Sequence, residues 1–317
     1  MAKADAPPVL SILVVAYNSQ AIIGDCLASI PAACTRYAYE VLLIDNGDGA
    51  TADLVAAQFP QVRIVPSQGN VGFAAGNNLL AAQAKGQFLL LLNPDVVLLP
   101  VAIDLLLDAT QTYPGAAAWG GVTLDREGRP DLGNTVHVPS LREMASRTLG
   151  RSIAARRQTI GFDEDTRVDV LSGSFVMFAR TAWDEVGGLD DRYFLYCEEV
   201  DLFYRLAQRG YGFWRVGAAR GYHYIGHGEA LSAKRMLYRA AGNMQFARLH
   251  WPKGKQHFAV LLTWLGAWQR LIVGRLIGRW VPRLGQVGEC HRDIALHPSQ
   301  WRHGYDPQRG LLAHLRP

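Results

Sequence analysis

The stretch Val9–Asn18, VLSILVVAYN, decides the fold class of this chain. Its run from Val9 to Val15 is apolar almost throughout, and it stops at Tyr17 and Asn18. A strand without polar alternation is buried on both faces, as in a sheet that helices cover on each side. The stretch therefore predicts a central strand of an α/β sheet.

Strand and helix patterns alternate along the chain after this stretch. We expect strands at Tyr39–Ile44, Val62–Val65, Phe88–Leu92 and Val168–Phe178, and helices at Ile22–Ile30, Thr51–Phe59, Leu79–Ala84 and Thr181–Val186. A glycine-rich loop is predicted at Gly69–Asn78, a loop or hairpin at Val122–Gly133, and a weakly ordered segment from there to about Asp163. The alternation indicates a mostly parallel sheet flanked by helices, in which ligands bind at the carboxyl ends of strands.

Charge and cysteine usage divide the chain and suggest where it works. Residues 229–317 hold 14 Lys and Arg against 4 Asp and Glu, whereas the rest holds 18 against 24. We therefore expect an α/β domain in residues 1–227 and a basic, mostly helical C-terminal extension in residues 228–317. The basic extension is typical of contact with an anionic surface, and a solvated basic face is the alternative. The absence of a CxxC pair and of a visible signal peptide favours a cytoplasmic location.

The extension is predicted to contain two helices, Met236–His250 and Gln256–Arg279. Phe258–Trp268 is strongly apolar, but the arginines that follow make the stretch too short and too charged for a transmembrane span. A helix with tryptophans beside arginines suits a membrane interface. Packing against the α/β domain is the equal alternative.

Polar residues follow two of the predicted strands. Asp45 can accept a hydrogen bond from a nucleotide base or a ribose hydroxyl, or it can form the turn. Pro94 turns the chain after the Phe88–Leu92 strand and aims Asp95 out of the sheet. A single carboxylate there, with open positions for water and phosphate oxygens, suits Mg²⁺ or Mn²⁺ on a diphosphate, and turn capping is the alternative.

Three carboxylates, Glu198, Glu199 and Asp201, fall within four residues. Burial beside like charge raises a carboxyl pKa, which suits a general base that works near neutral pH. The alternative is an ordinary helix start, where acidic residues face the positive end of the dipole. His223 and His227 close the α/β part and are candidate metal ligands or phosphate donors, with a structural role as the equal alternative.

These motifs, in this order, resemble the inverting glycosyltransferases of family 2 with the GT-A fold, and their rhamnosyltransferase-like branch most of all. The matching stretches are Ser11–Asn18, Leu43–Asn46, Asn70–Phe73, Asn77–Asn78, Leu91–Asp95, Leu171–Phe175, Gly187–Asp190 and Phe194–Leu202. They are weak singly but strong as a series, and the series spans roughly Val9 to His227, about two thirds of the chain.

The resemblance implies roles for individual residues. It places the nucleotide sugar against Ala16, Tyr17, Asn18, Asp45, Asn70, Gly72, Asn78 and Asn93. It makes Asp95 and His223 metal ligands and Glu199 the catalytic base. Glu198 and Asp201 would orient the acceptor or cap the helix, and Gly173 and Ser174 would line the acceptor pocket, with strand packing as the alternative. Two positions depart from the family pattern: Asn93 replaces the first Asp of the Asp-x-Asp motif, and Glu199 replaces an Asp base.

The resemblance also implies the partners. We expect a dTDP-, UDP- or GDP-linked donor, with dTDP-rhamnose favoured by the branch, and a saccharide or lipid-linked saccharide acceptor at the cytoplasmic face of the cell membrane. No nucleic-acid partner is expected. A sugar-nucleotide nucleotidyltransferase and a non-catalytic binding homologue are the alternatives, although Tyr17-Asn18-Ser19 stands where a nucleotidyltransferase has its glycine-rich phosphate loop.

Overall fold

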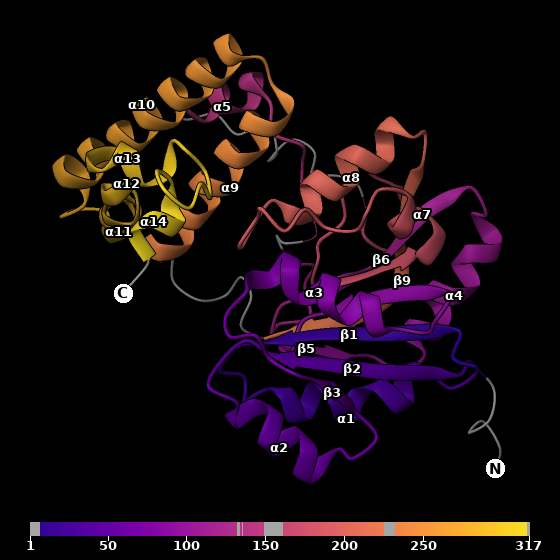
Figure 1. The fold of residues 1–317 in the computed structure, drawn as a ribbon. Helices are drawn as coiled ribbons and strands as arrows, with labels where there is room; N and C mark the ends of the chain where they lie inside the picture. Colours follow the sequence, from indigo (N-terminus) through magenta and orange to yellow (C-terminus); the bar gives the residue numbers. More distant parts are fainter. Residues whose placement is uncertain (1–6, 132–133, 135, 149–160, 225–231, 316–317) are drawn as a thin grey trace. The chain divides into compact units, whose positions relative to one another are not determined.

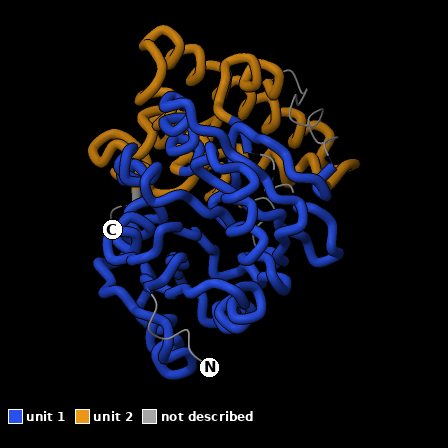
Figure 2. The backbone as a smooth tube through the Cα atoms, turned by 90° about the vertical axis from the view of Figure 1, so that its right-hand side faces the viewer, with its two compact units in different colours: residues 1–137, 161–191, 199–228 blue, residues 138–160, 192–198, 229–317 orange. Residues whose placement is uncertain are grey.

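The computed structural model describes residues 7–131, 134, 136–148, 161–224 and 232–315. The chain forms two compact units, which Figure 2 colours separately. The first comprises residues 1–137, 161–191 and 199–228, and the second comprises residues 138–160, 192–198 and 229–317. The predicted boundary at residue 227 stays a prediction.

The N-terminal strands of the first unit pair as predicted. They are β1 (Leu10–Ala16), β2 (Tyr39–Asp45), β3 (Arg63–Val65) and β4 (Phe88–Leu92). They lie in the order β3-β2-β1-β4, and every pairing among them is parallel. Their carboxyl ends therefore meet along one edge of the sheet (Figure 1).

The rest of the sheet is mixed. It consists of β5 (Val96–Leu98), β6 (Ala116–Leu124), β7 (Thr166–Arg167), β8 (Phe175–Ala179) and β9 (Gly212–His223). Within the described residues the order continues from β4 through β8, β6 and β9 to β5, and β7 also pairs with β9. Here β6 and β9 pair in parallel, and the other described pairings, β4 with β8, β8 with β6, β9 with β5 and β9 with β7, are antiparallel. The sheet is therefore parallel across β1–β4 and mixed beyond them.

Helices cover both faces of this sheet. Side chains of α1 (Ile23–Ala33), α2 (Ala50–Gln58) and α4 (Ala102–Thr112) share a core cluster with alternate residues of the central strands. The other face is covered by α3 (Gly72–Gln83), α7 (Arg180–Glu185) and α8 (Glu198–Gln208). There the Phe178 ring lies 5.3 Å from that of Phe203 and 5.5 Å from that of Trp183. Figure 1 shows α1 and α2 on one side of β1 and β2, and α3 on the other.

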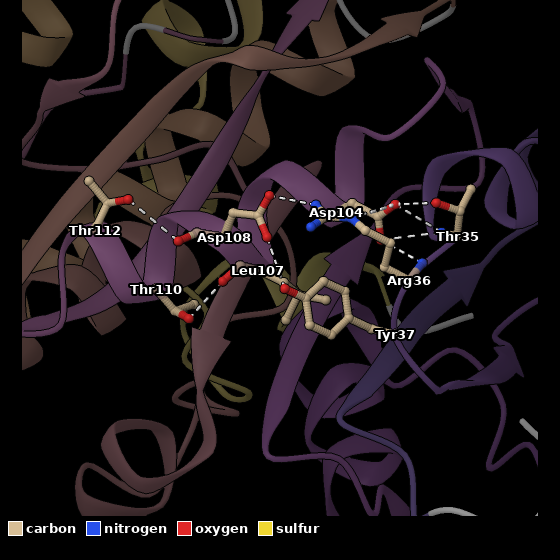
Figure 3. A network of polar contacts seen from close by, with 8 residues as sticks. All are labelled: Thr35, Arg36, Tyr37, Asp104, Leu107, Asp108, Thr110 and Thr112. Carbon is tan, nitrogen blue, oxygen red and sulfur yellow. Dashed lines mark hydrogen bonds and ion pairs between the residues drawn. The ribbon is translucent and has the colours of Figure 1, made fainter.

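A buried carboxylate ties α4 to the connection between α1 and β2 (Figure 3). Asp104, which is fully buried, accepts hydrogen bonds from the Thr35 amide at 3.0 Å, the Thr35 hydroxyl at 2.6 Å and the Arg36 amide at 3.1 Å. Burial alone would raise the pKa of Asp104, but these hydrogen bonds outweigh it and lower the pKa. Tyr37 and Arg36 both donate to Asp108 on the next turn of α4.

The second unit is helical in its described residues. Its helices are α5 (Leu141–Thr148), α9 (Ala233–His250), α10 (Lys253–Ile277), α11 (Pro282–Cys290), α12 (Arg292–Leu296), α13 (Pro298–Trp301) and α14 (Leu311–Leu315). The two helices predicted for the extension are confirmed as α9 and α10. α10 packs against α5, α9, α11 and α12.

Three sequence expectations are corrected. The stretch Gly69–Asn78 is not a loop throughout, because α3 begins at Gly72. α5 lies within the segment predicted to be weakly ordered. α10 is long and apolar enough to cross a membrane by length and composition, although the sequence suggested a shorter apolar stretch. His227 lies outside the described residues.

Candidate active site

The ends of β1 and β2 bring the predicted nucleotide-binding residues together. Ala16 is in register with Asp45, and its carbonyl accepts a hydrogen bond from the Asn46 amide at 2.8 Å. Tyr17 is 57% exposed at this edge. Asn18 has a positive φ of 50°, and a Cβ at Gly47 would stand 2.8 Å from its Oδ1. This edge is therefore formed by the turns that follow two neighbouring parallel strands.

The Asp45 carboxylate has backbone partners of its own. One oxygen accepts the Gly47 amide at 2.8 Å, and the other accepts the amides of Thr51 and Ala52 at 3.1 Å each. Asp45 is 2% exposed. Turn formation, the alternative left open by the sequence, is thus observed, and contact of Asp45 with a nucleotide stays a prediction.

The start of α3 forms the neighbouring wall. Gly72 has a φ of +86°, a conformation that favours glycine, and its amide is bound by the Asn70 side chain at 3.3 Å. The Gly72 carbonyl accepts a hydrogen bond from the Asn46 side chain at 2.9 Å. Asn78 lies further along α3, where its amide group donates to the Leu189 carbonyl at 2.7 Å and accepts the Leu189 amide at 3.1 Å. The structure gives Asn78 a bracing role, and its contact with the donor stays a prediction.

His223 lies between two carboxylates at the end of β9. Its Nε2 is 3.3 Å from Asp95 Oδ1, and its Nδ1 is 3.1 Å from Asp131 Oδ2. His223 pairs with Val96 across β5 and β9, which places it beside Asp95. Burial alone would lower the pKa of His223, but the hydrogen bonds to Asp131 and Asp95 outweigh it and raise the pKa to about 9. Sequence reasoning missed Asp131, because 92 residues separate it from His223 and no local motif marks it.

The Asp95–His223 pair fits a divalent cation. Two neighbouring ligands in an octahedral site with bonds of about 2.1 Å stand about 3 Å apart. The separation of 3.3 Å between Asp95 Oδ1 and His223 Nε2 is close to that value. Asp131 on the opposite ring nitrogen would fix the imidazole, as carboxylates commonly do for metal-binding histidines. In the described part of the chain, no cluster of three or more His, Cys, Asp and Glu could hold a metal. Diphosphate oxygens and water would thus have to complete the coordination.

Glu199 lies near the start of α8 and is half-buried. A Cβ built at Gly173 would stand 3.9 Å from Glu199 Cβ and 3.5 Å from the Phe73 ring, so Gly173 faces both side chains. The next residue, Ser174, accepts the Asn93 amide at 3.0 Å through its carbonyl. The chain therefore connects the surroundings of Glu199 directly to the loop that carries Asp95.

The other two carboxylates of the cluster are buried. Glu198 is 4% exposed, and Asp201 is fully buried. Asp201 Oδ2 lies 2.6 Å from Arg205 Nε, and Arg205 also donates to the carbonyls of Val186 and Gly188 at 2.7 Å each. The structure thus gives Asp201 a role in fastening α8 to the turn after α7. The predicted acceptor contacts of Glu198 and Asp201 stay predictions.

Two residues just before α8 have a strained backbone. Tyr196 and Cys197 have φ of 67° and 73°, in the left-handed region that non-glycine residues rarely adopt. Within the second unit, Arg235 donates to the Tyr196 hydroxyl at 2.9 Å, and Cys197 Sγ lies 3.4 Å from Asn243 Oδ1. Strain of this kind is often found at functional sites. No residue pattern in this segment predicts it.

Comparisons with known proteins concern the fold and the family of the chain. The fold is similar to that of a mannosyltransferase from Pyrobaculum calidifontis, solved in complex with GDP-Man and Mn²⁺, with a TM-score of 0.58 and 15% identity over 93% of this chain and 89% of that chain. This likeness confirms the predicted GT-A fold.

Two curated relatives are rhamnosyltransferases. The N-acetylglucosaminyl-diphospho-decaprenol L-rhamnosyltransferase of Mycobacterium tuberculosis is 33% identical over 69% of this chain and 77% of its own length. Rhamnosyltransferase WbbL of Escherichia coli is 26% identical over 60% of this chain and 74% of its own length. The model of the family "Glycosyl transferase family 2" matches residues 11–187. With more than half of its length matched, the chain belongs to glycosyl transferase family 2.

Proposed function

We propose that this glycosyltransferase moves a sugar, with rhamnose as the first candidate, from a nucleoside-diphosphate donor to a lipid-linked saccharide, with inversion at the anomeric carbon. The observation that carries the proposal is a short backbone connection between two chemical groups, the Asp95–His223 pair and the Glu199 carboxylate. Gly173 faces Glu199, and the carbonyl of the next residue, Ser174, accepts the amide of Asn93, two residues before Asp95. The Asp95–His223 pair suits a metal-bound diphosphate, and the Glu199 carboxylate suits an acceptor hydroxyl.

The acceptor side depends on Glu199. In this proposal its carboxylate accepts the proton of the acceptor hydroxyl as that oxygen attacks the anomeric carbon from the face opposite the leaving group. Gly173 leaves room beside Glu199, because any side chain there would approach Phe73 and Glu199. Inversion follows from a single displacement of this kind.

The donor side depends on Asp95 and His223, which would hold Mg²⁺ or Mn²⁺. A bound divalent cation would neutralise charge that develops on the departing nucleoside diphosphate. Asp131 holds the His223 ring through Nδ1, and the α3 start with Asn70 and Gly72 forms the neighbouring wall.

The relatives support the choice of substrates. Their names point to rhamnose transfer, and the name of one of them to a lipid-linked N-acetylglucosaminyl acceptor. For this chain we propose dTDP-rhamnose first, with UDP- and GDP-sugars as alternatives, and a role in cell-surface polysaccharide synthesis. We also propose a cytoplasmic location at the inner face of the cell membrane.

A donor panel tests the proposal. The full chain is incubated with dTDP-, UDP- and GDP-sugars, an N-acetylglucosaminyl lipid acceptor, and Mg²⁺ or Mn²⁺, and release of nucleoside diphosphate is measured. Glu199→Gln should lower kcat by about 100-fold or more while donor binding persists, because the amide cannot accept the proton. Glu289→Gln, on the exposed surface of α11, is the matched control and should leave kcat unchanged.

Three outcomes would contradict the proposal. Near-normal turnover by Glu199→Gln would remove the base assignment. Pyrophosphate released from a nucleoside triphosphate and a sugar phosphate would identify a nucleotidyltransferase instead. Donor binding without any turnover across the panel would favour a binding homologue.

A further inference from the structure

One side of α10 exposes a row of large apolar side chains, which the exposed Gln269 interrupts between Leu265 and Ile272. The exposed fractions are 60% for Phe258, 45% for Leu261, 42% for Leu265, 48% for Ile272 and 65% for Leu276. Their spacings of three, four, seven and four residues put them on the same side of a helix. At 1.5 Å per residue the row is about 27 Å long. We call these five side chains the α10 face.

The opposite side of α10 is packed within the second unit. Its buried residues are Ala259, Gly266, Ala267, Leu271 and Gly274. The backbone of α11 comes so close that a Cβ at Gly274 would stand 2.9 Å from Gly288 Cα. α10 is thus a helix with one side in its own unit, while the α10 face is exposed in the part of the chain that the structure describes.

Cations predominate around the α10 face, although the helices packed against α10 also carry Glu143, Glu289 and Asp293. Residues 230–288 contain 10 Lys and Arg and no Asp or Glu. Exposed cations lie at both ends of α10, with Lys253 and Lys255 at its start and Arg275 and Arg279 at its end. Trp280 is 64% exposed, and the Arg279 guanidinium lies 3.6 Å from the centre of its ring. Tryptophan and arginine side by side are typical of helices at a membrane–water interface.

The charge selects among the possible occupants. A second copy of this chain would bring two predominantly cationic regions together, and like charges across an interface are costly. A bilayer-spanning α10 would have to leave its packing against α5 and α11. It would also break the hydrogen bonds of Arg270 to the carbonyls of Gly266 and Arg147, at 2.7 and 3.1 Å. An anionic lipid bilayer can take up the apolar row at its acyl boundary and bind the cations at its headgroups.

We propose that the α10 face inserts in the plane of an anionic phospholipid bilayer, with the flanking Lys and Arg on the lipid headgroups. Its side chains would enter the acyl boundary, while the buried side of α10 keeps its packing. By binding the bilayer, the α10 face would hold the chain where a lipid-linked acceptor is embedded. This link to the acceptor rests on the proposed function, whereas membrane binding itself does not.

Vesicle co-sedimentation of the full chain tests this proposal. The probes are vesicles of phosphatidylcholine alone and of phosphatidylcholine with about one quarter phosphatidylglycerol. Wild-type protein should bind the anionic vesicles at least about tenfold more tightly than the neutral ones, and the difference should shrink in high salt. The variant Leu261→Ser/Leu265→Ser/Ile272→Ser should bind at least about 100-fold more weakly, because three large apolar groups are lost.

Two controls keep the test specific. Leu296→Ser changes a 39% exposed leucine of α12, outside the α10 face, and should bind like wild type. Arg275→Glu/Arg279→Glu leaves the α10 face intact and should lose the preference for anionic vesicles. If the serine variant does not fold, this arginine variant still tests the proposal.

The outcomes are decisive in both directions. Wild-type protein that ignores anionic vesicles, or a folded serine variant that binds as wild type does, overturns the proposal. A wild-type dimer that the serine variant converts to a monomer in sedimentation velocity would assign the α10 face to a second copy. Transfer to a water-soluble acceptor should be equal in wild type and serine variant, so loss of catalysis and loss of the membrane surface are told apart.

Discussion

Replacing Gly242 of α9 with alanine is expected to slow sugar transfer far more than it destabilises the chain. A Cβ at this position would stand 2.4 Å from the Tyr196 carbonyl oxygen and 3.3 Å from Cys197 Cβ. The first obstacle is backbone, which has no alternative rotamer. Tyr196 and Cys197 are the strained residues immediately before Glu198, and Glu199 follows.

The magnitude follows from the contact. Ordinary contact begins at 3.4 Å, so the 2.4 Å approach to Tyr196 must open by about 1 Å. Overpacking of this kind costs about 1–3 kcal/mol, and alanine returns about 1 kcal/mol over glycine inside a helix. The net loss of about 0–2 kcal/mol lowers Tm by only a few degrees for a chain of this size. A catalytic group displaced by about 1 Å, in contrast, can lose about 100-fold in rate.

The assay pairs activity with stability. We expect Gly242→Ala to lower kcat by about 100-fold with little change in the KM for the donor, measured by nucleoside diphosphate release with a water-soluble acceptor. Gly254→Ala in α10 is the matched control, because a Cβ there meets no atom within 4 Å. The control should keep full activity and an equal or higher Tm.

A Gly242→Ala variant with kcat within twofold of wild type would refute this reasoning. So would a fall in kcat that matches the fraction of unfolded protein at the assay temperature. In the first case the Tyr196–Cys197 segment adapts without moving the start of α8. In the second, Gly242 contributes to stability alone.

Three further predictions concern carboxylates. Asp201→Ala should lower the free energy of unfolding by about 3 kcal/mol in urea titrations, because Arg205 is left without its buried partner; an unchanged transition midpoint would contradict this. Asp131→Asn should weaken Mn²⁺ binding, measured by calorimetry, by about 10- to 100-fold, because the His223 ring is held less firmly. An affinity equal to that of wild type would show that Asp131 does not support the metal site. Asp104→Ala should destabilise the chain by about 1–3 kcal/mol at pH 7. Since the folded pKa of Asp104 is lowered below 3.8, the wild-type advantage is present above that value and is lost as pH falls through the folded pKa, which acid titrations of both proteins will check.

The central strands could be predicted because their sequence signal is local. β1, β2 and β4 are apolar runs that the sheet buries on both faces, so each run marks its own strand. The polar residues after them, Asp45 and Asp95, follow from where the runs stop. An α/β sheet and one edge of the candidate site could therefore be predicted from local patterns, whereas the GT-A fold is implied by the resemblance of the whole motif series.

The rest depends on contacts that sequence spacing does not encode. Asp131 reaches His223 because the chain beyond β6 turns back, with a backbone bond from Asp131 to Thr123 at 2.9 Å. The left-handed conformation of Tyr196 has no residue signature, since glycine and asparagine are the usual occupants. Gly72 is predicted to lie in a loop because glycine disfavours helix interiors, yet it begins a helix.

Helix geometry supports the proposal that Glu199, rather than Glu198 or Asp201, is the carboxylate that faces the acceptor. At about 100° per residue, Glu198 and Asp201 are separated by three residues and lie on nearly the same side of α8, whereas Glu199 points elsewhere. Glu198 and Asp201 are buried, and Asp201 is held by Arg205. Glu199 stays half-buried with Gly173 beside it. Glu199 is one carbon longer than the Asp that the family resemblance implies at this position, and Gly173, which faces it, has no side chain.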